Sequence, residues 1–355
     1  EVARHRGGDR QLPAGAQVPA DHGAAVRAHG LEPGQEAAGE VLGPGHGRAR
    51  RQGFGDTPRE GSRREIVGRS AEERIAWFQD QQLWIPYDEA RDALMLVEEA
   101  IERPRSPRMK GYLVIAESNN GKSRLARECV ARYPIIDAPD SDRVILRTLL
   151  IELAPTPDEG SIYDSILDQL CQPYRPKDPV SVKRRQVVNA LQNCGLKALL
   201  VDELQRVLSA NQSKRRQVIE ALRNIAGAVP LPLIVFSTPR GANALASSDE
   251  MINRLHPVEL PTWKLDAKFR MLLSSFQSVL PLRERSALTG KSLAPLIHSK
   301  TEGLIGEVRD LLDMALQHAL RGGLEQINKD VLDAIPWTPP SDRKRLIKRY
   351  GRASA

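Results

Sequence analysis

One stretch decides which fold this sequence predicts: Ala116-Glu117-Ser118-Asn119-Asn120-Gly121-Lys122-Ser123. An apolar run, 112–115, precedes it, and a helix-like stretch, 124–132, follows it. Strand, tight loop, Gly-Lys-Ser and helix are the context of a phosphate-binding loop, whose backbone N–H groups and helix N-terminus face an anion. We therefore expect all eight residues to bind a nucleotide, with Lys122 on the β- and γ-phosphates and the Ser123 hydroxyl on Mg²⁺.

The first residue of this P-loop departs from the usual pattern. Gly is common there, and this chain has Ala116. Gly is required only where the backbone φ is positive, so Ala116 is acceptable if its φ is negative. The Gly before the Lys is present as Gly121. The alternative, a chance Gly-Lys-Ser in a loop, is the weaker one because a strand and a helix flank this loop.

A second part of the same site is predicted about 80 residues downstream. The apolar run 196–201 shows no alternation, which is typical of a buried parallel strand, and it ends at Asp202 and Glu203. Ligands bind at the carboxyl ends of parallel strands. We expect Asp202 to support Mg²⁺, directly or through water, and Glu203 to polarise an attacking water. The alternative is a helix N-terminus, where acidic residues are favoured.

Three further residues fit this site by their places in the chain. Thr238, or its neighbour Ser237, ends the next predicted strand and would position the hydrolytic water, or else cap the next helix. Arg254 ends the helix before the last strand, where ring-forming ATPases carry an arginine that reaches a neighbour's γ-phosphate. Arg309 would meet the nucleotide from a C-terminal helix. For both arginines the alternative is an ordinary solvated helix residue.

Composition limits the class of protein. The chain has 355 residues and a net charge of +7, which permits a polyanionic partner without proving one. Its three cysteines have no metal-ligand spacing, which indicates a reducing compartment without a disulfide framework. No apolar run approaches the ~20 residues of a membrane span, and no secretory signal is visible. We expect a soluble, cytoplasmic protein.

The pattern along the chain predicts an α/β fold with five parts. Residues 1–62 hold 13 of the 26 glycines and little periodicity, so we expect them to be disordered or mistranslated. A helical segment over 63–108 should lead into a P-loop core over 109–262. The core alternates helices with strands near 112–115, 144–151, 196–201, 231–236 and 258–260, which favours a parallel sheet. A helical lid over 263–338 and a basic tail over 339–355 should complete the chain.

Several stretches resemble a known family beyond the P-loop itself. They are Trp84-Ile-Pro-Tyr87, Ser118 to Ser123, Pro155-Thr-Pro-Asp158 with Ile162-Tyr163, Leu260-Pro-Thr-Trp263, Leu280-Pro-Leu-Arg283 with Ser286, Gly303-Leu-Ile-Gly306 and Trp337-Thr-Pro-Pro-Ser341. In these stretches the chain resembles the TniB-type transposition ATPases of the AAA+ superfamily, relatives of TnsC and more distantly of MuB. The resemblance covers about residues 70 to 349.

The chain departs from that family's pattern at three places. Ala116 replaces the first Gly of the loop. Gln205 stands where the family usually has His after Asp-Glu and an apolar residue. Arg254-Leu255-His256 stands where the family tends to have Arg-Phe. The carboxylates of Asp202 and Glu203 are intact, so the resemblance still implies ATP hydrolysis.

The resemblance also implies partners. Such proteins bind ATP, assemble as homo-oligomers or filaments on double-stranded DNA, and recruit a DDE transposase to a target without cutting DNA. DNA contact would be to phosphates, and the candidates are Lys177, Lys183, Arg184 and Arg185. A solvated helix face is their alternative. The basic tail around Arg343–Arg349 could contact DNA or dock a partner.

Two other functions are compatible with the same motifs. One is another AAA+ ATPase of DNA metabolism, of the helicase or clamp-loader type; Leu260-Pro-Thr-Trp263 and Leu280-Pro-Leu282 speak against it. The other is a nucleotide-gated binding module without significant hydrolysis. Glu203 argues against that module, because a pure switch need not keep a general base.

Overall fold

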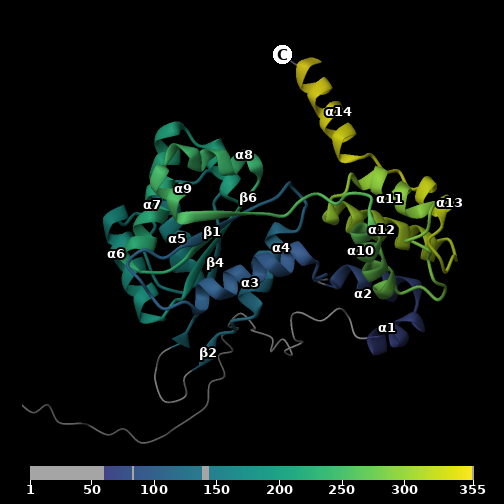
Figure 1. Ribbon diagram of the computed structural model, residues 1–355, viewed down its shortest axis with the longest axis horizontal. Helices are drawn as coiled ribbons and strands as arrows, with labels where there is room; N and C mark the ends of the chain where they lie inside the picture. Colours follow the sequence, from purple (N-terminus) through teal and green to yellow (C-terminus); the bar gives the residue numbers. More distant parts are fainter. Residues whose placement is uncertain (1–59, 82–83, 138–143, 354–355) are drawn as a thin grey trace, which may run out of the picture. The chain divides into compact units, whose positions relative to one another are not determined.

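The computed structural model describes residues 60–81, 84–137 and 144–353 (Figure 1). The prediction of a disordered or mistranslated segment over 1–62 falls almost entirely outside these residues. The chain begins its described part with the helix α1 (Glu60–Val67).

A five-stranded parallel sheet forms the centre of the P-loop core (Figure 1). Its strands lie in the order β4-β5-β6-β1-β7. Every strand pair is parallel, with Tyr112 opposite Ile234 and Leu150 opposite Leu200. All five residues of β5 and of β6 are buried, as their apolar runs predict. The strands are β1 (Gly111–Ile115), β4 (Thr148–Glu152), β5 (Ala198–Asp202), β6 (Leu233–Ser237) and β7 (Leu255–Glu259).

Helices cover both faces of this sheet because alternate strand residues point to opposite sides. On one face, residues such as Leu199 and Val201 pack with α5 (Glu159–Gln169), α6 (Val180–Asn193) and α7 (Gln212–Ala228). On the other face, Leu200, Ile234 and their neighbours pack with α3 (Asp88–Glu102) and α4 (Lys122–Ala131). This three-layer arrangement confirms the predicted α/β class.

A separate hydrophobic core forms the helical lid. Its C-terminal helices are α10 (Ala267–Val279), α11 (Leu293–Thr301), α12 (Ile305–Arg321) and α13 (Lys329–Ala334). The N-terminal helix α2 (Ala71–Asp80) contributes Ile75 and Phe78 to the same core. Helix α2 begins at the predicted capping box of Ser70 and Glu73.

The segment predicted as one N-terminal unit over 63–108 therefore divides between two cores: α2 packs in the lid and α3 packs on the sheet. The chain passes between the two cores at 84–87 and again at 260–263. The rings of Tyr87 and Trp263, one from each passage, are 4.8 Å apart in an edge-to-face contact.

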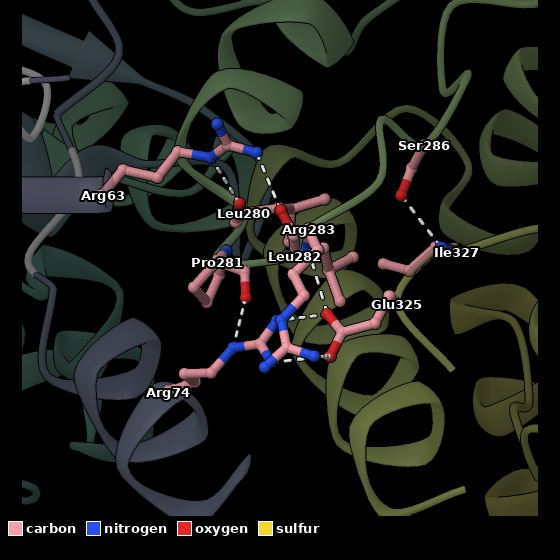
Figure 2. A network of polar contacts seen from close by, with 9 residues as sticks. All are labelled: Arg63, Arg74, Leu280, Pro281, Leu282, Arg283, Ser286, Glu325 and Ile327. Carbon is pink, nitrogen blue, oxygen red and sulfur yellow. Dashed lines mark hydrogen bonds and ion pairs between the residues drawn. The ribbon is translucent and has the colours of Figure 1, made fainter. Parts of the chain in front are cut away.

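Two arginines join the N-terminal helices to the lid (Figure 2). Arg74 is 2% exposed. Its Nε donates to the Pro281 carbonyl at 2.7 Å, and its two terminal nitrogens donate to the Glu325 carboxylate at 2.9 and 2.6 Å. Arg63 donates to the carbonyls of Leu280 and Leu282 at 2.8 and 2.9 Å. The family-like stretch Leu280-Pro-Leu-Arg283 is therefore a docking site for this chain's own N-terminal helices.

Two elements differ from the sequence-based expectation. The strand expected over 144–151 is broken into β3 (Val144–Ile145) and β4, because the N–H of Leu146 turns to the Cys194 carbonyl. β3 pairs instead with β2 (Ile136–Asp137). The expected tail over 339–355 is helical as α14 (Pro340–Ala353), and a proline at the first helical position favours that start.

Candidate functional site

The P-loop has the geometry of a phosphate-binding loop. It joins β1 to α4, and Gly121 precedes α4 with a φ of 85°, a left-handed conformation that glycine adopts without strain. Lys122 is 6% exposed, and its Nζ donates to the carbonyls of Ala116 and Glu117 at 3.0 and 2.7 Å. Ala116 is buried and its φ is not positive, which meets the condition for replacing Gly.

Two asparagines fasten this loop to its surroundings. The buried amide of Asn120 donates to the Leu260 carbonyl at 3.0 Å. The carbonyl of Asn119 accepts the Gly306 N–H at 2.9 Å, and the Asn119 amide donates to the Glu307 carboxylate at 3.1 Å. A Cβ at Gly306 would lie 1.9 Å from the side-chain oxygen of Asn119, so glycine is needed for this close approach. The P-loop is thus attached directly to the lid helix α12.

A cavity of about 620 Å³ lies against the loop, within the usual range for a ligand site. Its lining includes Lys122, Ser123 and Glu203, and Ile305, Gly306 and Arg309 of α12. It also includes apolar residues that the sequence did not reveal as part of the site: Trp84, Ile85, Tyr87, Ala90 and Phe276. A lining with both polar and apolar groups suits the phosphates and the base of a nucleotide.

The acidic pair lies at the carboxyl end of β5, as predicted. Asp202 is 6% exposed, and its Oδ1 accepts the Glu203 N–H at 2.8 Å. Glu203 has a φ of 62°, a left-handed conformation that is uncommon for a residue with a side chain and gathers at functional sites. Its carboxylate accepts from Gln205 Nε2 at 2.8 Å and faces Arg206 Nε at 3.5 Å. Glu203 lines the cavity with Lys122.

Burial and nearby charges act against each other on Lys122. Burial lowers the pKa of its ammonium, and the carboxylates of Asp202, Glu203 and Glu117 partly offset this effect. An anion bound at the loop would favour the charged form further. The electrostatics therefore suit a phosphate ligand.

Thr238 has the capping role that the sequence left as an alternative. Its Oγ1 accepts the Gly241 N–H at 3.4 Å at the start of α8 (Pro239–Ala242). Its own N–H donates to Gln205 Oε1 at 3.3 Å. Gln205, at the start of the 3-10 helix η1 (Leu204–Ser209), thus bridges Thr238 and Glu203. Sequence reasoning treated Gln205 only as a departure from a pattern, because a bridge to a residue 33 positions away leaves no local signal.

The two predicted arginines lie in different places. Arg309 lines the cavity, and its guanidinium donates to the carbonyls of Phe78 and Gln81 at 2.5 and 3.1 Å, so it is not a solvated surface residue. Burial lowers its pKa. Arg254 is the last residue of α9 (Asp249–Arg254), half-buried, and is not among the residues that line this chain's own cavity.

The predicted DNA-binding set needs one correction. Lys183 is 4% exposed, and its Nζ pairs with Asp164 at 2.7 Å and donates to the Pro176 carbonyl. A buried, paired ammonium does not face a DNA phosphate, so the prediction for Lys183 is wrong. The other three candidates, Lys177, Arg184 and Arg185, are exposed.

Comparison with known proteins identifies the family. The model of the family described as "Bacterial TniB protein" matches residues 74–265, more than half of the chain. The chain belongs to the TniB family. The match begins in α2 and ends after β7, so it spans the P-loop, the acidic pair and Arg254.

Solved structures with a similar fold are AAA+ ATPases. The ORC1 protein of Aeropyrum pernix, solved in complex with DNA, is 14% identical with a TM-score of 0.52; 77% of this chain and 69% of that chain are covered. The ORC2 protein of the same organism, solved with ADPNP and ADP, is 16% identical with a TM-score of 0.50 over 73% and 70% of the two chains. Cdc6p from Pyrobaculum aerophilum has 14% identity, a TM-score of 0.50 and coverage of 71% and 72%. At these identities the likeness establishes the fold.

Curated relatives match a smaller part of the chain. The 2-isopropylmalate synthases of Bacillus thuringiensis subsp. konkukian and Bacillus cereus are 28% identical over 168 residues, 47% of this chain. This chain spans about a quarter of the length of those proteins, 26%.

No helix among the described residues is long and apolar enough to cross a membrane. Family, fold and P-loop together support an ATP-binding AAA+ protein.

Proposed function

We propose that this TniB-family protein hydrolyses ATP, assembles as a homo-oligomer on double-stranded DNA and recruits a DDE transposase there, so that it regulates DNA transposition in the cytoplasm. The observation that carries the ATPase part is that Lys122, Glu203 and the lid residue Arg309 line one cavity. The cavity thus combines a loop that holds phosphates, a carboxylate that acts as the base and a cation from the lid.

The residues in and beside the cavity have separate roles. Backbone N–H groups of the loop and the ammonium of Lys122 hold the phosphates. The Ser123 hydroxyl and the Asp202 carboxylate are hard oxygen donors that fit Mg²⁺, which would neutralise phosphate charge when bound. Glu203 takes the proton of the attacking water, and Gln205 holds the carboxylate of Glu203 relative to Thr238. Arg309 contacts the nucleotide from the lid.

The position of Arg254 supports oligomerisation. Because Arg254 does not line its own chain's cavity, we assign it to the γ-phosphate of a neighbouring subunit. Double-stranded DNA is the proposed polyanion because the net charge is +7 and because the similar ORC1 protein was solved in complex with DNA. The exposed Lys177, Arg184 and Arg185 are candidate phosphate contacts.

The test is to measure ATP affinity, ATP turnover and ATP-dependent duplex binding for the wild type and for Lys122→Ala. We expect ATP affinity to fall by about 10- to 100-fold, because a charge-assisted hydrogen bond contributes about 1.5–3 kcal/mol. Lys110→Ala, an exposed lysine just before β1, is the matched control. Unchanged ATP affinity in a folded Lys122→Ala protein contradicts the assignment.

A nucleotide-gated module without significant hydrolysis is the second candidate. It is favoured by the contacts that Gln205 and Arg206 make with Oε2 of Glu203, because they leave only Oε1 of this carboxylate to accept a proton. Duplex binding that depends on ATP, with no phosphate release over many binding cycles, would select this candidate.

A further inference from the structure

Helix α14 is unusual because its side chains over 343–350 show no buried face. Every side chain from Arg343 to Tyr350 is exposed. An isolated helix of this length is marginal in water, and most helices are stabilised by packing an apolar face. The helix carries five cations in seven residues: Arg343, Lys344, Arg345, Lys348 and Arg349.

The cations are arranged so that they repel one another. Lys344 and Lys348 are four residues apart, and so are Arg345 and Arg349. Like charges at this spacing are neighbours on a helix surface and destabilise it. Lys344, Lys348 and Arg349 form no ion pair with any described residue, although Arg345 pairs with Asp342 at 3.2 Å. An anionic partner along this side would remove the repulsion.

The first turn of α14 is attached to the lid through acidic residues. The N–H of Ser341 donates to the Glu302 carboxylate at 2.9 Å. The guanidinium of Arg343 pairs with Glu307 and lies over the Trp337 ring at 5.7 Å. Beyond that turn the side chains from Lys344 to Arg349 are exposed, so a partner can reach them.

Glu307 connects α14 to the P-loop. It is 6% exposed, in the first turn of α12. One carboxylate oxygen accepts the amide of Asn119 at 3.1 Å, and the other pairs with Arg343. Asn119 belongs to the P-loop and lines the cavity. Two direct contacts therefore lead from the nucleotide cavity to the base of α14.

We propose that α14 binds the phosphate backbone of double-stranded DNA and that Glu307 couples this surface to the nucleotide cavity. The proposal rests on the proposed function, which it makes specific. A duplex presents regularly spaced phosphates that match cations on successive turns of a helix. A lipid surface fits less well, because the five cations outnumber the exposed apolar side chains, Leu346, Ile347 and Tyr350, and membrane-surface helices bury a broad apolar face.

The coupling works in both directions. A nucleotide that moves Asn119 breaks the hydrogen bond between Asn119 and Glu307. This change alters the ion pair between Glu307 and Arg343. By linkage, ATP and DNA must then change each other's affinity by the same factor, typically about 5- to 150-fold for coupled sites. We expect ATP to strengthen duplex binding by at least about fivefold, at the lower end of that range.

The first experiment measures duplex affinity against salt by fluorescence anisotropy on the full chain. In the triple variant Lys344→Gln, Lys348→Gln, Arg349→Gln, the slope of log affinity against log salt should fall by up to about 2.7, since each phosphate contact contributes about 0.9. ATP affinity without DNA should not change. The control triple variant Lys110→Gln, Lys264→Gln, Lys291→Gln removes three exposed lysines elsewhere. If the triple variant in α14 has the same slope of log affinity against log salt as the control triple variant, the proposal is wrong.

The second experiment tests the coupling with Glu307→Gln, which keeps the shape of the side chain. Duplex affinity without nucleotide should be retained, and the strengthening by ATP should fall to near onefold. If ATP strengthens duplex binding of this variant as fully as in the wild type, the role proposed for Glu307 is wrong.

The α14 variant also distinguishes DNA from a membrane. If it loses binding to phosphatidylserine vesicles and keeps its duplex affinity, the surface serves a membrane and the proposal is wrong. Wild-type protein that binds no duplex at all would count against the proposed function itself.

Discussion

In the proposed function, Glu203 is the residue on which hydrolysis depends. Its carboxylate lines the cavity and accepts a hydrogen bond from Gln205, and its backbone is left-handed. Such a conformation costs about 1–3 kcal/mol and persists only where the surroundings impose it. Here the N–H of Glu203 bonds to the Asp202 side chain, so the two acidic residues hold each other in place.

Glu203→Gln should keep ATP affinity and slow turnover by about 10²–10⁴-fold, because an amide cannot accept the proton of the attacking water. Single-turnover phosphate release measures this effect. Glu284→Gln, which alters an exposed carboxylate that does not line the cavity, is the control and should retain turnover within about threefold of the wild type. Wild-type turnover in Glu203→Gln would place the base on another residue.

Gly306 lies where helix α12 approaches the P-loop closely. A Cβ there would meet the side chain and the carbonyl of Asn119 at 1.9 and 2.6 Å. Gly306→Ala must therefore shift the P-loop, and we expect a loss of about 1–3 kcal/mol in the free energy of unfolding together with weaker ATP binding. Gly227→Ala in α7 is the matched control, because nothing lies within 4 Å of its added methyl group.

Thermal unfolding of the two alanine variants separates crowding from helix propensity. Gly227→Ala should stabilise the protein by about 0.5–1 kcal/mol, since alanine is the better helix former. If Gly306→Ala is as stable as Gly227→Ala and binds ATP normally, the tight junction between loop and lid is not needed.

At the scale of elements, an ion pair in which Arg74 is buried contributes to the docking of α2 on the lid. Arg74 is 2% exposed and meets Glu325 through two hydrogen bonds (Figure 2). The hydrogen bonds from Arg74 hold the pKa of Glu325 below its ordinary value. A carboxyl whose pKa is lower in the folded state contributes stability above its unfolded pKa, and this contribution is lost as the pH falls through the folded pKa.

Glu325→Gln should lower the free energy of unfolding at neutral pH by about 1.5–3 kcal/mol, the usual contribution of hydrogen bonds to a charged group, because Glu325 is only partly buried. The same change should flatten the loss of stability below about pH 4.5, near the unfolded pKa of a glutamate. Urea unfolding from about pH 7 down to about pH 3 measures both effects. Glu284→Gln, an exposed carboxylate nearby, should leave the acid-side slope as in the wild type. A parallel slope in Glu325→Gln would show that the pair does not titrate in this range.

The elements also show which site features a sequence can predict. The P-loop and the acidic pair were placed correctly because each depends on a strand and the few residues after it. The apolar lining of the cavity was missed because Trp84 and Phe276 meet there from positions far apart in the chain. Lys183 was misplaced although a signal existed: with Val187 and Leu191 it repeats every four residues on the buried face of α6.

At the scale of the whole molecule, hydrolysis should need more than one subunit. Arg254 lies outside its own cavity, so Arg254→Ala should keep ATP binding and lose oligomer-dependent turnover, by up to the ~10³–10⁵-fold attributed to arginine fingers. The wild-type rate per subunit should rise with protein concentration. Arg240→Ala, an exposed arginine in α8, is the control. A wild-type rate independent of concentration would contradict action in trans.

The passages at 84–87 and 260–263 have a mechanical consequence for the whole molecule. Two bodies joined by one chain segment can rotate freely about it, whereas two segments that contact each other cannot move independently. Tyr87 and Trp263 make that contact beside the cavity. Any movement of the lid relative to the sheet must therefore either carry both passages together or break this ring contact.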